Sequence, residues 1–92
     1  FLRLIDRDLV DESNLPRQVL FDARHAAQRA PKAQAAVETL ERAGGPTRYE
    51  ARLVHLGASA LGDCLEDVDL VLDGTDNVGT RYLLNDWCVR QA

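Results

Sequence analysis

The chain has 92 residues, enough for one small domain; 46% of them are hydrophobic, 28% are charged, and the formal net charge is -4. Its 11 basic side chains are interleaved with 15 acidic ones and form no basic stripe, which argues against nucleic acid as a partner. The apolar runs are far shorter than the roughly 20 residues that cross a bilayer and no signal-peptide pattern opens the chain, so we expect a cytoplasmic protein with no membrane partner.

The chain opens on residues 1–6, a stretch that is apolar except for Arg3 and ends at Asp6. This pattern is typical of a mostly buried parallel strand whose carboxyl end faces a ligand crevice. The polar residues 7–16 predict a loop, and residues 15–21 predict a short helical turn. Residues 22–30 show no clear period, so we expect them to be irregular or weakly helical.

A helix is predicted from Pro31, a residue suited to the first helical turn. Apolar residues then recur at the spacing of one buried helix face, at Ala33, Ala36, Val37 and Leu40. Residues 44–46, Gly-Gly-Pro, predict the end of this helix. Residues 47–55 alternate between apolar and polar side chains, with Tyr49, Ala51 and Leu53 on one face, and predict a half-exposed strand.

The remaining residues alternate between helix and strand patterns. Ser59 can cap a short helix that runs to about Glu66. Residues 69–73 form a nearly continuous apolar run and predict an interior strand. The turn at residues 74–77 leads into a final helix, on which an apolar face is expected at Leu84, Trp87 and Cys88.

This alternation predicts an α/β fold, a Rossmann-like open and mostly parallel sheet with helices on both faces. The expected core strands are residues 1–5, 49–54 and 70–72. Ligands bind such sheets beyond the carboxyl ends of the strands. We therefore expect Asp6 and the turn at residues 73–77 to be neighbours in space.

Taken one at a time, the chemistry-bearing residues are weak signals. Asp6 could accept hydrogen bonds from a ribose diol, but an acidic residue that ends a strand is often only a turn residue. His25 and His55 have no partner at a telling spacing, so surface or strand-end histidines are expected. Cys64 and Cys88 have no spacing typical of zinc ligands or of a disulfide framework, and reduced, largely buried thiols are expected.

Three motifs taken together are more specific. The first contains Asp6, Asp8, Val10, Ser13, Asn14, Leu15, Arg17 and Gln18; the second is Pro31-Lys32 at the start of a helix; and the third contains Asp73, Asp76, Asn77 and Arg81. In this order they resemble the D-x-D-x-V-x-x-S-N-L-x-R-Q, P-K and D-x-x-D-N-x-x-x-R motifs of the ubiquitin-activating-type adenylating family, which includes ThiF, MoeB and HesA. The resemblance covers almost the whole chain.

The resemblance implies a role for each matching position. Asp6 would hold the ribose of ATP, the phosphates would be contacted by Asn14, Arg17 and Lys32, Gln18 would support them, and Asp76 would help to place Mg²⁺. An Arg fork, a Lys charge and a metal ion are the groups that stabilise negative charge on a phosphate chain. Lys32 could instead be an ordinary lysine, although a cation is mildly unfavourable in the first turn of a helix. Arg81 is expected to pair with Asp73 or Asp86.

The function implied by the resemblance is ATP-dependent adenylation of the C-terminal carboxylate of a small ubiquitin-like sulfur-carrier protein of the ThiS or MoaD type. We expect residues 1–92 to be the central part of one ThiF/MoeB-type nucleotide-binding adenylation domain, without its Gly-rich loop and its C-terminal portion. Such a piece should have little activity alone. Family members usually form homodimers, so a homodimer is expected here.

Two alternatives remain open at the level of the sequence. An NAD-dependent Rossmann dehydrogenase also ends its second strand with an acidic residue on the ribose, but it would not require Asn14, Arg17, Lys32 and Asp76 together. A noncatalytic carrier-binding or dimerisation module could retain the fold without the activity. Residues 17–32 also form a stretch about two residues longer than in the commonest members of the family, which leaves the subfamily open.

Overall fold

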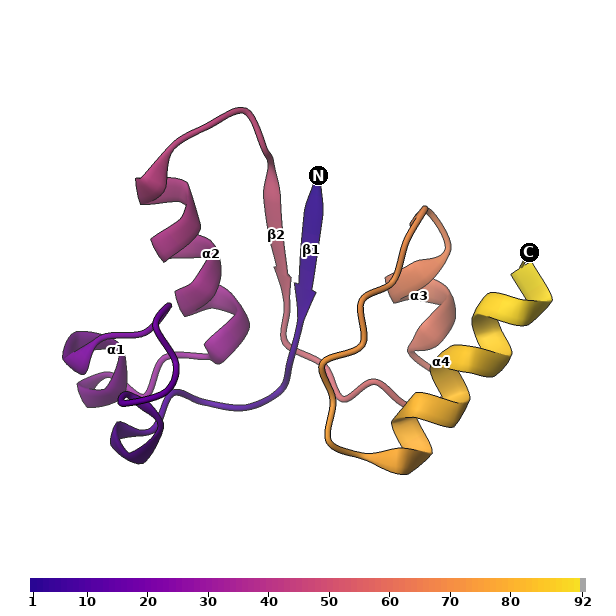
Figure 1. The fold of residues 1–92 in the computed structure, drawn as a ribbon, viewed down its shortest axis with the longest axis horizontal. Coiled ribbons are helices and arrows are strands. Elements are labelled where there is room, and N and C mark those ends of the chain that lie inside the picture. Colours follow the sequence, from indigo (N-terminus) through magenta and orange to yellow (C-terminus); the bar gives the residue numbers. More distant parts are fainter. Residues whose placement is uncertain (92) are drawn as a thin grey trace. The chain divides into compact units, whose positions relative to one another are not determined.

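The computed structural model describes residues 1–91, except for the side chain of Asn14. The chain divides into two compact units, residues 1–54 and 55–92, and each is described by itself. Figure 1 shows the elements along the chain. The first unit contains β1 (Leu2–Ile5), the 3-10 helix η1 (Glu12–Asn14), α1 (Ala23–Ala27), α2 (Lys32–Ala43) and β2 (Tyr49–Arg52). The second contains α3 (Leu61–Leu65) and α4 (Val78–Gln91).

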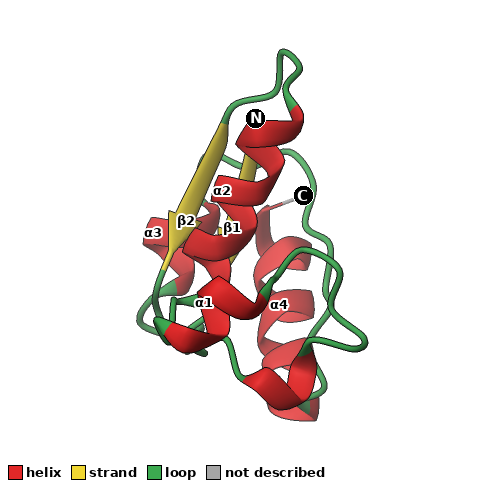
Figure 2. Ribbon diagram, turned by 90° about the vertical axis from the view of Figure 1, so that its left-hand side faces the viewer, coloured by secondary structure: helices red, strands yellow, loops and turns green. Residues whose placement is uncertain are grey.

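The first unit is built on a parallel pair of strands, β1 and β2, connected through α2. Their register pairs Leu2 with Tyr49 and Ile5 with Arg52. Helix α2 packs against both strands, and Figure 2 shows it lying along the sheet. A β-α-β connection between parallel neighbours is the unit from which Rossmann-like sheets are made, so the α/β fold class is confirmed.

The buried face of α2 explains this packing. Ala33, Ala36 and Val37 are buried and Leu40 is half-buried, as the spacing predicts. Small alanine side chains let a helix approach a sheet closely while still removing apolar surface from water. The helix ends at Gly44, whose φ of 83° is unfavourable for residues with a Cβ, so the predicted end of the helix is also confirmed.

Strand β2 differs from its prediction in two ways. It is only four residues long, and all four residues are half-buried instead of alternating in burial. Ion pairs join its polar side chains. The Glu50 carboxylate accepts a hydrogen bond from Arg52 and lies 3.3 Å from the guanidinium of Arg3 on the neighbouring strand. Such cross-strand pairs stabilise the polar face of a sheet.

The segment between the strand and α2 is more ordered than predicted. The expected helical turn forms at η1, before residues 15–21, and residues 22–30 contain the regular helix α1. His25 is 1% exposed, so the prediction of a surface histidine was wrong. The ring Nδ1 of His25 accepts a hydrogen bond from the backbone N–H of Asp22 at 3.2 Å. The backbone N–H of His25 in turn donates to Asp22 Oδ1 at 3.0 Å. This capping box turns the ring inward, which sequence spacing alone did not reveal.

The second unit contains helices and no strand among its described residues. The prediction of an interior strand at residues 70–72 was wrong: Leu70 is 75% and Leu72 is 83% exposed. A strand needs a hydrogen-bonded neighbour, and the described part of this unit provides none. The predicted cap at Ser59 was also wrong, since the N-cap of α3 is Ala60 and makes no side-chain cap.

Helix α4 begins at Val78, and the side chain of Asn77 accepts a hydrogen bond from the Thr80 N–H at 3.2 Å. Leu84 is buried and Trp87 half-buried, as the predicted face requires, but Cys88 is exposed. Cys88 therefore lies on an uncovered face of α4. In the described part of the chain, no helix is both long and apolar enough to cross a bilayer.

Candidate functional site

The first feature of the site is Asp6, directly after β1. Its N–H donates to the carbonyl of Arg52 at 3.1 Å, so Asp6 lies where both parallel strands end. Its carboxylate Oδ1 accepts a hydrogen bond from the Asp8 N–H at 2.8 Å. The structure therefore places Asp6 at the sheet edge where ligands of parallel α/β proteins bind, with its carboxylate oriented by the following loop.

The loop after Asp6 is tied to the start of α2. The Lys32 N–H donates to the Asp8 carbonyl at 2.8 Å, and the Val10 N–H donates to the Ala30 carbonyl at 2.7 Å. An antiparallel bridge between Leu9 and Pro31 lies between these bonds. Val10 is 2% exposed and anchors the loop in the core. Two motifs that are far apart in the sequence thus become neighbours, and Asp6 and Lys32 are linked through Asp8.

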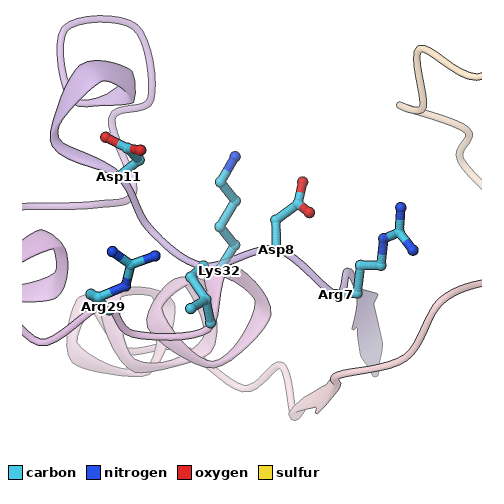
Figure 3. Close-up of a pocket in the computed structure, with 6 residues that line it drawn as sticks. Arg7, Asp8, Asp11, Arg29 and Lys32 are labelled. Atoms are coloured by element: carbon cyan, nitrogen blue, oxygen red, sulfur yellow. The ribbon is translucent and has the colours of Figure 1, made fainter.

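A shallow, open depression of about 540 Å³ lies over this junction. It is lined by Arg7, Asp8, Leu9, Asp11, Arg29 and Lys32. Figure 3 shows the side chains of Lys32 and Asp8 projecting to the same side, with Asp11 and Arg29 beyond Lys32. Three cations from two separate segments therefore surround a solvent-open surface, an arrangement that suits an extended polyanion.

Asp11 adds a negative charge to this cluster, and its carboxylate also caps the following 3-10 helix. Its Oδ1 accepts a hydrogen bond from the Ser13 N–H at 3.0 Å, which caps η1. The pKa of Asp11 lies below its ordinary value, first because of this hydrogen bond and then because of the positive charges of Arg29 and Lys32. The carboxylate is therefore ionised at neutral pH and helps to shape the loop.

Other residues predicted for the phosphate site do not line this depression. Arg17 and Gln18 follow η1, where Arg17 is exposed and Gln18 is half-buried. The side chain of Asn14 lies outside the described residues. Gln18 Oε1 is buried without a hydrogen-bond partner in the described structure. A buried polar atom left in this way costs about 1 to 3 kcal/mol, so a polar group of a ligand would be a favourable partner for Gln18.

Asp76 belongs to the second unit and lies in the turn that precedes α4. The turn is organised by Asp73, whose Oδ1 accepts from the Thr75 N–H at 2.8 Å and from the Thr75 hydroxyl at 2.6 Å. These bonds, with help from the charge of Arg81, hold the pKa of Asp73 below its ordinary value. Arg81 donates to the Thr75 carbonyl from Nε at 3.1 Å and from Nη2 at 2.7 Å.

Arg81 Nε also lies 3.8 Å from Asp73 Oδ2, so the predicted pairing of Arg81 with Asp73 is confirmed. These contacts commit Asp73 and Arg81 to the turn itself. Asp76 is exposed, and no described residue binds its carboxylate. The turn therefore presents one carboxylate to solvent, at Asp76, while its neighbours fix the backbone.

This geometry fits Mg²⁺ in one specific way. The described residues contain no group of three or more His, Cys, Asp or Glu side chains that could hold a metal ion. Mg²⁺ is commonly bound by one or two carboxylates together with substrate phosphates and water. Asp76 can supply such a carboxylate, so this residue fits a metal that is bound together with a nucleotide.

Sequence reasoning missed part of the cluster. Asp8 was named only as a position of the first motif, and Arg7, Asp11 and Arg29 were given no role. For Asp8 and Asp11 a signal exists, because both lie in the polar loop after the first strand. For Arg29 the only signal is that it stands three residues before Lys32, and its conformation was not predictable from that spacing.

A parallel β-α-β unit with an acidic residue at its strand ends and cations beside it belongs to the Rossmann-like α/β class. The comparison with protein families is more specific. The family model described as ThiF family matches residues 1–92. The chain therefore belongs to the ThiF family.

Curated relatives agree with this assignment. The chain is 40% identical over 88 residues to the adenylyltransferase and sulfurtransferase uba4 of Aspergillus niger, covering 96% of this chain and 18% of that protein. It is 40% identical over 86 residues to the probable adenylyltransferase/sulfurtransferase MoeZ of Mycobacterium tuberculosis, covering 94% and 21%. It is 38% identical over 88 residues to the adenylyltransferase and sulfurtransferase MOCS3 of Danio rerio, covering 96% and 19%. The chain thus spans about a fifth of each relative.

Proposed function

We propose that the protein containing this chain uses ATP to adenylate the C-terminal carboxylate of a small ubiquitin-like sulfur-carrier protein. The observation that carries the proposal is the ThiF family match over residues 1–92, together with relatives that are named as adenylyltransferases. These relatives favour adenylation over the nicotinamide dehydrogenase considered above. Residues 1–92 would then be the central part of one adenylation domain.

In this reaction a carboxylate oxygen of the carrier attacks the α-phosphorus of ATP. A bond forms between that oxygen and phosphorus, the bond from the α-phosphorus to the bridging oxygen breaks, and pyrophosphate leaves with the bonding electrons. The product is an acyl-adenylate. The carboxylate is already ionised at pH 7, so the enzyme needs no general base and acts by positioning the reactants and stabilising charge.

The residues of this chain would share that task. Asp6, oriented by its hydrogen bond from Asp8, would accept the ribose hydroxyls. Lys32, which lines the depression, would contact the phosphates. The planar guanidinium of Arg17 would also bind them. Asn14 and Gln18 would complete the phosphate contacts, the latter with an amide oxygen that has no partner in the described structure.

Asp76 would take part in holding Mg²⁺ against the phosphates. The ion, when bound with the nucleotide, neutralises charge on the phosphate chain. Among the residues of the turn, Asp76 is suited to this task because Asp73 is already bound to Thr75. A homodimer is part of the proposal as well, because family members usually dimerise.

Formation of the carrier adenylate tests the proposed function directly. The full-length protein is incubated with ATP, Mg²⁺ and a carrier of the ThiS or MoaD type, and the carrier is analysed by mass spectrometry for a covalently added AMP. We expect the adduct on the intact carrier and none on a matched carrier whose C-terminal carboxylate is amidated. Adduct formation on both carriers, or on neither, would contradict the proposal.

A further inference from the structure

The inference concerns Arg29, which lies two residues after the end of α1 at Ala27. Its φ of 51° lies in the left-handed region, and no other non-glycine residue of the described chain has a positive φ. The Arg29 N–H donates to the Ala26 carbonyl at 3.1 Å, and the Ala30 N–H donates to the His25 carbonyl at 2.9 Å. This pair of bonds is the Schellman motif, in which the position of Arg29 is usually occupied by glycine.

An arginine at this position is unfavourable for the local backbone, because its Cβ crowds the neighbouring carbonyl in the left-handed conformation. The backbone requirement therefore does not explain the residue type. Its side chain also has no structural partner: the guanidinium of Arg29 makes no hydrogen bond or ion pair with any described residue. Arg29 is also exposed, so the described structure gives its side chain no pairing role.

The placement of Arg29 offers a different explanation. The Schellman motif ends α1 at Ala27, and α2 begins three residues after Arg29, at Lys32. Both side chains line the same depression as Arg7, which comes from the loop after β1 (Figure 3). Asp11 attracts Arg29 electrostatically but forms no ion pair with it, and its Oδ1 accepts a hydrogen bond from the Ser13 N–H. A cation is thus presented beside Lys32 with its donors unused.

We propose that Arg29 is a further phosphate-binding residue, whose guanidinium contacts the polyphosphate of ATP together with Lys32. The proposal rests on the proposed adenylation site and extends it by one residue. Arginine suits this role because its planar fork can donate two parallel hydrogen bonds to phosphate oxygens. Loss of such charge-assisted hydrogen bonds typically weakens binding about tenfold or more.

The test compares variants of the full-length protein that keep the backbone conformation. Arg29→Gly and Arg29→Asn remove the guanidinium with residues that tolerate positive φ, so the melting temperature should stay the same or rise. The affinities for ATP and for adenosine are measured by calorimetry. We expect both variants to bind ATP about tenfold more weakly and adenosine as tightly as the unmodified protein, and Arg29→Lys to recover only part of the ATP affinity.

Two controls separate the possible causes. Arg42→Ala removes a cation at the other end of α2, where Arg42 pairs with Glu38, and should leave ATP affinity unchanged. Lys32→Ala should weaken ATP binding. If Lys32→Ala weakens binding and Arg29→Gly does not, the inference about Arg29 is wrong and the adenylation site stands. If neither variant changes ATP affinity, the adenylation site itself is wrong. Equal losses for ATP and adenosine in Arg29→Gly would also overturn a phosphate contact.

Discussion

Replacement of the buried His25 by alanine should destabilise the protein, although this residue lies outside the proposed phosphate contacts. His25 is 1% exposed, and its Nδ1 accepts a hydrogen bond from the backbone N–H of Asp22, the N-cap residue of α1. It also meets the ring of Phe21 edge-on, with ring centroids 6.4 Å apart. Truncation to alanine removes the side-chain half of the capping box and the ring contact, and it leaves a cavity.

The size of the effect follows from these contacts. A lost helix cap costs about 1 kcal/mol, and a lost aromatic pair costs about 0.5 to 1.5 kcal/mol. A cavity left by a large buried side chain adds to both terms. We therefore expect His25→Ala to lower the free energy of unfolding by about 2 to 4 kcal/mol. His25→Gln keeps an acceptor that can reach the Asp22 N–H, so its loss should be smaller.

Urea unfolding of the full-length protein, followed by circular dichroism, measures these differences. His55→Ala is the matched control, because His55 is exposed just beyond β2 and its truncation should change stability by no more than about 0.5 kcal/mol. If His25→Ala is no more destabilising than His55→Ala, the assignment of His25 to a buried capping box is wrong. If His25→Gln is as destabilising as His25→Ala, the cap contributes nothing beyond packing.

Two further predictions concern charge and thiol exposure. Hydrogen bonding from Arg24, supported by the charges of Arg24 and Arg42, holds the pKa of Glu38 below its ordinary value of 4.5. A lowered native pKa stabilises the fold above the unfolded pKa, and this stability is lost as pH falls through the native value. Stability should thus fall less steeply below about pH 4.5 in Glu38→Gln, and an unchanged slope in acid unfolding curves would contradict the pairing. Cys88 is exposed and Cys64 is buried, so a maleimide should label Cys88 in the native protein and Cys64 only after denaturation; equal native labelling would contradict the assigned burial.

The first unit was largely predictable from the sequence. The apolar run before Asp6, the periodic alanines of α2 and the glycines after it are local signals, and each gives the predicted element, although β1 is half-buried or exposed and not mostly buried. The contact of the loop after Asp6 with the start of α2 was not predictable. It depends on two backbone hydrogen bonds between residues about twenty positions apart, and side-chain patterns carry no information about them.

The prediction failed where burial depends on neighbours and not on local pattern. Residues 70–72 have a strand pattern, but a strand forms only beside a hydrogen-bonded partner. His25 was taken for a surface residue because its role depends on a ring that folds back onto the helix start, a rotamer choice that spacing does not fix. Arg29 was overlooked because a left-handed conformation is expected of glycine.

Pyrophosphate exchange into ATP, measured in the full-length protein with saturating carrier and Mg²⁺, tests adenylation by this site most directly. If Lys32 and Asp76 stabilise charge on the phosphates and the metal, Lys32→Ala and Asp76→Ala should each lower the exchange rate by about 10²-fold or more, equivalent to at least about 2.7 kcal/mol of barrier. Cys88→Ser, which alters an exposed thiol, should exchange at nearly the unmodified rate. Near-normal exchange in both Lys32→Ala and Asp76→Ala would contradict the assignment of this chain's residues to adenylation.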